Sequence, residues 1–152
     1  MDKEQFYKSH EGLHELYLSQ DFELLETQVH EYLKIAEDFK DNWNYGNALH
    51  RSYIYLGLIA LSKNKLKEAE NYLRLSVQKT SPQIKTFGPN MLLASKFLEL
   101  GEKEIFNKYL KACKKIWGWA FRTKWYWECR KALRRGEIPN FGLRLTVNLY
   151  DK

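Results

Sequence analysis

The sequence has few residues that interrupt helices, cross-link the chain or span a membrane. Proline occurs only three times in 152 residues and glycine eight times, so long stretches lack a helix breaker. Two cysteines, Cys113 and Cys129, are too few for a disulfide scaffold and fit a reducing compartment. No apolar run approaches the roughly 20 residues of a membrane-spanning helix, and the first residues lack the apolar stretch of a secretion signal. We therefore expect a cytoplasmic protein without a membrane segment.

Hydrophobic residues are abundant. They make up 44% of the chain and aromatic residues 15%, which excludes a disordered chain and is enough for one core. Apolar residues recur every three or four positions in six stretches, as in amphipathic helices: residues 21–39, 44–61, 66–77, 91–100, 105–117 and 119–135. Because the intervening turns are short, we expect an all-α protein of six or seven antiparallel helices over residues 1–139.

Two of the predicted helix pairs share a residue pattern. The residues Leu56, Gly57, Ala60, Asn64, Leu73 and Ser76 recur 37 positions later as Leu93, Ala94, Phe97, Gly101, Leu110 and Cys113. In a weaker copy, Tyr17, Phe22, Leu25 and Val29 correspond to Leu61, Leu66, Ala69 and Leu73 at an offset of 44. Such a period predicts an α-solenoid, and the small residues Gly57 and Ala94 predict close helix crossings.

These positions resemble the tetratricopeptide repeat family. The matching residues are Tyr53, Leu56, Gly57 and Ala60 on the first helix and Ala69, Leu73 and Ser76 on the second. A closer resemblance is to a group of small bacterial proteins of this repeat type that have no assigned activity. It is carried by Ser81-Pro82-Gln83, Phe87-Gly88-Pro89-Asn90-Met91, Leu93-Ala94, Cys113, Trp117 and Gly136-Glu137-Ile138-Pro139. The resemblance implies protein or peptide binding in a concave groove.

A polar stripe on one predicted helix is the candidate groove. By analogy with tetratricopeptide repeats, the stripe at 47, 51 and 54 faces the concave side, and the start of the next first helix lies beside it. The predicted groove residues are Asn47, His50, Arg51, Ile54, Asn90 and Met91. Alternatively, Asn47 and Asn90 cap or tie loops within the repeats.

Charge is distributed unevenly along the chain. Residues 1–41 carry a net charge of −7 and residues 108–152 a net charge of +9. In the last predicted helix, the core face consists of Phe121, Trp125, Cys129, Ala132 and Leu133. The outer, basic aromatic face consists of Lys124, Trp127, Arg130, Lys131 and Arg134. This face could bind nucleic acid by stacking and phosphate neutralisation, bind an acidic protein, or make internal cation–π contacts between Trp127 and Lys131 or Arg134.

The string His10-Glu11-Gly12-Leu13-His14 has the form H-E-x-x-H. On one helix the two histidines would share a face and could hold zinc, with His30 or Glu31 as the third ligand. Gly12 weakens a helix, and the string lies near a terminus where side chains are poorly ordered. We therefore interpret the string as a coincidence and expect no metal, no cofactor and no catalytic site.

The end of the chain breaks the helical pattern. Apolar residues alternate strictly with others over residues 140–150, which predicts a β-strand, with an extended tail packed across the helices as the alternative. We assign residues 140–152 to this tail. Since a lone strand cannot satisfy its own backbone, it would pair between two copies or add to a partner's sheet. We predict pairing between two copies through residues 140–150, and hence a homodimer.

Three hypotheses about function follow. The first is a non-enzymatic module that binds a protein or peptide with its concave face and its basic terminal helix. A special case of it is sequestration of an acidic protein partner, as by an immunity protein or antitoxin. The second is a nucleic-acid-associated protein that uses the basic aromatic face. The third is a zinc hydrolase built on His10 and His14.

Overall fold

The computed structural model describes residues 1–117 and 119–149, and the side chains of residues 119–123 lie outside this description. The described residues form α-helices and one 3₁₀-helix, which confirms the all-α prediction. The elements are α1 (Lys3–Lys8), α2 (Leu13–Leu18), α3 (Phe22–Glu37), α4 (Tyr45–Ser62), α5 (Leu66–Leu75), α6 (Pro82–Phe87), α7 (Leu92–Glu99), α8 (Lys103–Ile116), α9 (Trp119–Arg134) and the 3₁₀-helix η1 (Gly142–Leu145).

Three short helices were not expected from the periodicity. Helices α1, α2 and α6 have six residues each, too few for an apolar period to stand out. Helix α6 begins where the Ser81 hydroxyl accepts a hydrogen bond from the Ile84 amide at 3.1 Å, and it ends at Gly88, whose φ is 85°. The six longer helices lie within a few residues of their predicted ranges.

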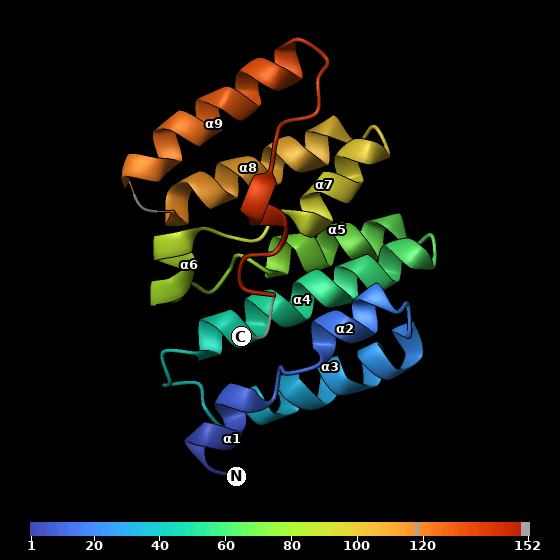
Figure 1. The fold of residues 1–152 in the computed structure, drawn as a ribbon, viewed down its shortest axis with the longest axis vertical. Helices are drawn as coiled ribbons and strands as arrows, with labels where there is room; N and C mark the ends of the chain where they lie inside the picture. The colour runs from blue at the N-terminus through green and yellow to red at the C-terminus, as the bar shows by residue number, and fades with distance from the viewer. Residues whose placement is uncertain (118, 150–152) are drawn as a thin grey trace.

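The helices are stacked in chain order (Figure 1). Helix α3 packs on α4, α4 on α5 and α7, α7 on α8, and α8 on α9. Helix α6 lies against α4, and η1 lies against α7. Helices α4 and α7 therefore contact each other, and both also contact the end of the chain, α7 through η1 and α4 through residues 148 and 149.

The turns α2–α3, α4–α5 and α7–α8 share one backbone geometry. The residues Gln20, Asn64 and Gly101 have φ of 62°, 57° and 80°, all in the left-handed region. In each turn the next amide donates to a carbonyl five residues earlier, at 2.9 to 3.0 Å: Asp21 to Leu16, Lys65 to Ala60 and Glu102 to Phe97. These bonds close the end of the first helix of each pair as a Schellman-type cap does.

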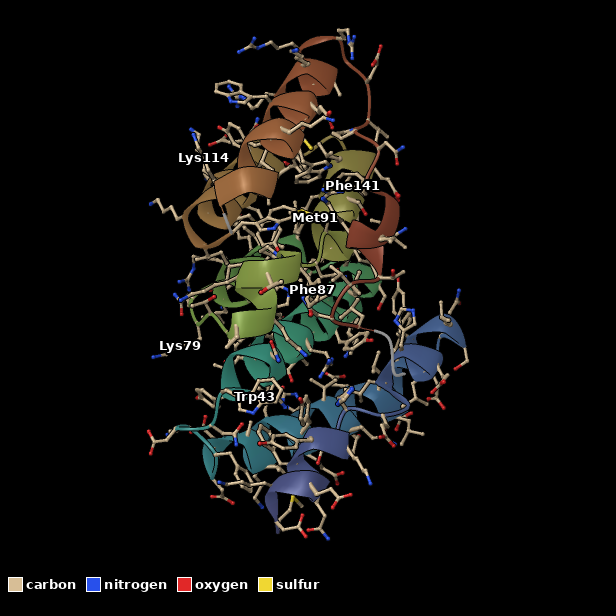
Figure 2. The ribbon with its side chains drawn as sticks, turned by 60° about the vertical axis from the view of Figure 1, so that its left-hand side comes forward. Trp43, Lys79, Phe87, Met91, Lys114 and Phe141 are labelled. Carbon is tan, nitrogen blue, oxygen red and sulfur yellow. The ribbon has the colours of Figure 1, made fainter. Side chains whose placement is uncertain are left out.

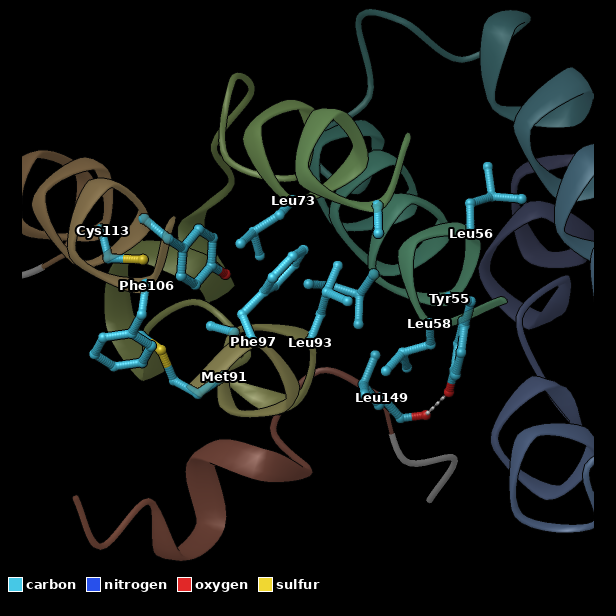
Figure 3. Packing of buried hydrophobic residues seen from close by; sticks show 14 of the residues in the cluster. Tyr55, Leu56, Leu58, Leu73, Met91, Leu93, Phe97, Phe106, Cys113 and Leu149 are labelled. Carbon is cyan, nitrogen blue, oxygen red and sulfur yellow. Dashed lines mark hydrogen bonds between the residues drawn. The ribbon is translucent and has the colours of Figure 1, made fainter. Parts of the chain in front are cut away.

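The core is continuous through the stack (Figure 3). Leu73 of α5 and Leu93 and Phe97 of α7 are almost fully buried. A Cβ built on Gly57 of α4 would overlap Cδ2 of Leu93, so the predicted close crossing at Gly57 is confirmed. Ala94 is fully buried. Removal of this apolar surface from water, at about 25 cal/mol per Å², is the main stabilising term of the fold.

The β-strand predicted over residues 140–150 is wrong for the part that the structure describes. Residues 142–145 form η1 and the next residues form turns. The left-handed φ of Gly142 (52°) and Asn148 (64°) is incompatible with a continuous strand. Phe141 and Leu149 are buried against the helices. Of the alternative prediction, an extended tail packed across the helices, the structure shows the packing but not the extended conformation.

The described part of the chain contains no helix that combines enough length with enough apolarity to cross a membrane.

Candidate functional site

The predicted groove is occupied by the chain's own C-terminal segment, residues 141–149. All six predicted groove residues are buried. Three backbone carbonyls of the segment accept hydrogen bonds from this region: Asn148 from Arg51 Nε at 2.7 Å, Val147 from Asn90 Nδ2 at 2.9 Å, and Arg144 from the Met91 amide at 2.8 Å. The Leu149 carbonyl accepts from the Tyr55 hydroxyl at 3.4 Å (Figure 3). The site predicted to hold a peptide thus holds residues 144–149.

Asn90 organises this contact. Besides the side-chain bond to Val147, its backbone N–H donates to His50 Nε2 at 2.9 Å, and its backbone carbonyl accepts from the Tyr109 hydroxyl at 2.7 Å. Its side-chain oxygen accepts from the Leu92 amide at 2.8 Å at the start of α7. Because these contacts use both the side chain and the backbone of Asn90, the residue fits the alternative that it ties loops.

His50 is fully buried and neutral. Its Nε2 accepts the Asn90 amide proton, so Nδ1 carries the ring proton and donates to the Ser76 carbonyl at 2.6 Å. Burial, together with the nearby charge of Arg51, lowers the pKa of His50 from 6.5 to about 4. The side chain is therefore a structural link between α4, the end of α5 and the start of α7.

Asn47 ties α4 to α6. Its Nδ2 donates to Asn44 Oδ1 at 2.8 Å and to Gln83 Oε1 at 2.7 Å, and its Oδ1 accepts from the Ser81 hydroxyl. The sequence Ser81-Pro82-Gln83 therefore serves to dock α6 on α4. Like Asn90, Asn47 fits the loop-tying alternative.

An open groove of about 620 Å³ remains beside the C-terminal segment. Helix α1 contributes Tyr7, the loop before α4 contributes Trp43, α6 contributes Phe87, and the C-terminal segment contributes Leu143. The exposed fractions of Trp43, Phe87 and Leu143 are 50%, 60% and 84%. Figure 2 labels Trp43 and Phe87, which lie on the same side of the molecule.

These groove residues were not predicted from the apolar pattern of the sequence. Trp43 and Phe87 fall outside the repeating apolar pattern, and Leu143 was assigned to a strand. One feature of the sequence could have indicated them. Two large apolar side chains lie in a loop and at a helix end, at positions that the helical apolar pattern does not assign to the core.

Arg51 lies at the floor of this groove. Its exposed fraction is only 6%, and besides the Asn148 carbonyl it contacts the Tyr32 hydroxyl, from Nη1 at 3.2 Å. Both acceptors are uncharged. No carboxylate of the described residues lies within ion-pair distance of the guanidinium.

The basic aromatic face of α9 is oriented as predicted. Trp125 and Cys129 are buried, whereas Lys124, Lys131 and Arg134 are exposed and Trp127 is 50% exposed. Arg130 is partly buried and donates to Asn107 Oδ1 at 3.3 Å. These four cations form no ion pair with a carboxylate in the described ranges. Phe121, assigned to the core face of the same helix, lies outside the described side chains.

The cation–π partner of Trp127 differs from both predicted partners. Lys114 Nζ of α8 lies 5.8 Å from the Trp127 ring centroid and 4.6 Å from that of Tyr126. A second cation–π cluster joins the C-terminal segment to α8 and α9, since the Arg144 guanidinium lies 4.5 Å from the Trp125 ring and 5.3 Å from the Trp117 ring.

The H-E-x-x-H string does not lie on one helix. Gly12 has a φ of 83° and separates α1 from α2, so the premise of a shared helical face for His10 and His14 is wrong. His14 is buried, with Nδ1 3.1 Å from the Tyr55 hydroxyl. Among the residues that the structure describes, no three His, Cys, Asp or Glu side chains form a metal-binding group.

Neither cysteine is an activated nucleophile. Both thiols are buried, and burial raises the pKa of Cys113 far above its usual range and that of Cys129 to about 12. A protonated, enclosed thiol is a poor nucleophile.

Comparison of the chain with protein-family models, with curated protein sequences and with solved structures finds no match in any of the three.

Proposed function

We propose that this chain is a non-enzymatic binding module of the tetratricopeptide repeat type, and that it holds a peptide segment of a partner protein in the groove beside its C-terminal segment. The shared geometry of three turns supports the repeat assignment. The left-handed residues Gln20, Asn64 and Gly101 are separated by 44 and 37 positions, the same offsets as the apolar repeats.

The observation that carries the binding function is the exposed apolar lining of the groove. Trp43, Phe87 and Leu143 expose half or more of their surface around one concavity of about 620 Å³. Concavities lined by large apolar side chains with a few polar groups are typical of binding sites. A peptide placed there would run beside residues 143–148, which occupy the inner part of the concave side.

The charge of the site favours an acidic partner. The lining of the groove includes Arg51 and contains no Asp or Glu. The C-terminal part of the chain, residues 108–152, has a net charge of +9, which attracts acidic surfaces over distances of about a Debye length. Sequestration of an acidic protein in the cytoplasm, in the manner of an immunity protein or antitoxin, fits this charge.

Site-specific photo-crosslinking tests the proposal. A photoreactive phenylalanine analogue is placed at position 87, and in a separate variant at position 100. Leu100 is a matched control because both side chains are 60% exposed, but Leu100 does not line the groove. We expect irradiation of host cells to link a partner through position 87 and not through position 100, and Trp43→Ala to abolish the link.

The opposite results would contradict the proposal. A partner that crosslinks equally through both positions does not use the groove. The absence of any crosslink through position 87 would mean that the groove has no protein ligand in the host cell.

A second candidate function is nucleic-acid binding by the basic aromatic face. The observation that favours it is the half-exposed Trp127 among Lys124, Lys131 and Arg134, which have no carboxylate partner in the described residues. An aromatic ring can stack on a base while cations neutralise phosphates.

Binding of a 30-nucleotide single strand, measured by fluorescence anisotropy, tests this candidate. We expect affinity to fall steeply with salt, and Arg130→Glu with Arg134→Glu to lower it by well over tenfold at low salt. The control is the double variant Lys8→Glu with Lys40→Glu, which changes the net charge by the same amount outside α9. If this control and the α9 double variant bind the strand equally well, a specific α9 site is rejected.

A further inference from the structure

We propose that Arg51 recognises a carboxylate, so that the peptide held in the groove carries an Asp or Glu side chain between large apolar residues. The inference rests on the proposed function and specifies its ligand. It begins with the state of the Arg51 guanidinium.

Arg51 is a buried cation that has no counter-ion among residues 1–117 and 119–149. Its side chain is more than nine-tenths buried, yet its hydrogen-bond acceptors are a backbone carbonyl and a tyrosine hydroxyl. Burial of a guanidinium costs several kcal/mol unless an anion compensates it. Within the described part of the chain, no carboxylate does so.

The guanidinium also retains an unused donor group. A guanidinium has five N–H donors, of which Nε and Nη1 supply those to Asn148 and Tyr32. Nη2 has no hydrogen-bond partner among the described residues, and it is not fully enclosed, so it remains accessible from outside. Arg51 lines the open groove, where a ligand oxygen could meet this donor.

The surroundings of Arg51 favour an anion with apolar neighbours. The lining contains no Asp or Glu, and Asn44, Gln83 and Asn148 contribute uncharged amides, so a ligand carboxylate would meet no like charge there. Around them stand Trp43, Phe87 and Leu143, which offer apolar contact on both sides. An acidic residue flanked by aromatic or aliphatic residues fits both features, whereas a polyanion such as RNA lacks the apolar part.

Arg51 also holds the C-terminal segment, and a test must separate the two roles. Asn90 holds the same segment through the Val147 carbonyl but does not line the groove. Asn90→Ala therefore removes one of these tethers and keeps the guanidinium. Arg51→Gln removes the charge together with the Asn148 contact.

The experiment starts from a displayed library of random dodecapeptides selected on the full-length chain. Peptides that bind are synthesised with each acidic residue and with the matching amide, and both are titrated by fluorescence anisotropy. We expect the acidic form to bind at least about tenfold more tightly to the wild type and to Asn90→Ala, as for a charge-assisted hydrogen bond. For Arg51→Gln we expect the two forms to bind equally.

Each other outcome rejects one of the two proposals. Selected peptides without acidic residues, or equal binding of the acid and amide forms by the wild type, would overturn the role of Arg51 while leaving the groove as a peptide site. Because this comparison uses the wild type, it stands even if Arg51→Gln does not fold. Failure to enrich any peptide over the control Phe87→Asp would overturn the peptide-binding function itself.

Discussion

At the scale of single residues, the buried polar groups of this chain hold elements together. His50 and Asn90 bond to each other, and through Ser76, Tyr109 and Val147 they join four parts of the chain. Buried polar groups that are fully hydrogen-bonded rigidify a core, whereas a group that loses its partner costs 1–3 kcal/mol, as an order of magnitude. We therefore expect protonation of His50 to lower the free energy of unfolding of the whole protein.

The stability of the protein should fall below pH 6.5. An unfolded His50 takes up a proton as the pH drops through 6.5, but the folded side chain does so only near its pKa of about 4. The neutral form thus supports folding fully above pH 6.5, and this contribution is lost as the pH falls toward 4. We expect a loss of about 3 kcal/mol in the free energy of unfolding over this window.

Urea unfolding at pH 7.5 and at pH 4.5 measures this effect. His50→Gln should be less stable than the wild type at pH 7.5 and should show a smaller loss at pH 4.5. The control is the same change at an exposed histidine, His30→Gln. If His50→Gln loses as much stability between pH 7.5 and pH 4.5 as the wild type does, other groups cause the pH dependence.

At the scale of elements, helices and their phases could be predicted because their determinants are local. Apolar spacing located the six longer helices, and on α9 it placed Trp125 inside and Trp127 outside, as the structure has them. The tail could not be predicted in this way. Its alternation looked like a strand, but the helices supply the hydrogen-bond donors and the apolar contacts that fold it into turns. Local pattern carries no information about such distant partners.

The crossing of α4 and α7 gives a direct test of packing. A methyl group at position 57 would overlap Leu93 Cδ2 in a fully buried region, so Gly57→Ala should cost about 1–3 kcal/mol and Gly57→Leu more. Thermal melting measures the effect. Leu93→Val removes the overlapping atom, and the double variant should therefore be more stable than the sum of the two single changes predicts. Unchanged melting of Gly57→Leu, whose larger side chain has no room beside Leu93, would place the crossing elsewhere.

At the scale of the whole molecule, the predicted groove is filled by the chain's own C-terminal segment. The predicted groove at Asn47, His50 and Arg51 contacts residues 144–149 of the same chain, which form the end of η1 and the turns that follow it. The open part of the site lies beside this segment and is lined by Trp43 and Phe87. The sequence could not reveal this, because the tail's destination depends on the assembled stack.

This arrangement removes the premise of the predicted homodimer. That prediction required unsatisfied backbone groups and a free apolar face in residues 140–150. Four carbonyls of the C-terminal segment instead accept hydrogen bonds from α4, the Asn90 region and the start of α7, and Phe141 and Leu149 are buried in the same chain. We therefore expect light scattering at micromolar concentration to give the mass of a monomer, and a dimer mass would restore the pairing hypothesis.

The same arrangement makes the C-terminal segment part of the fold and not a removable strap. Two leucines of the segment provide matched variants, since Leu149 is fully buried and Leu143 is 84% exposed. Leu149→Ala should lower the free energy of unfolding by about 2–5 kcal/mol, whereas Leu143→Ala should leave it nearly unchanged and weaken only peptide binding.

Deletion of residues 140–152 should be more damaging than either, because it uncovers the His50 and Asn90 contacts and the Trp117–Trp125 pair together, and we expect the shortened chain to aggregate. Chemical denaturation of the three variants checks this order. A stable, monomeric shortened chain that binds peptides more tightly than the full chain would show instead that the segment is a displaceable competitor for the groove.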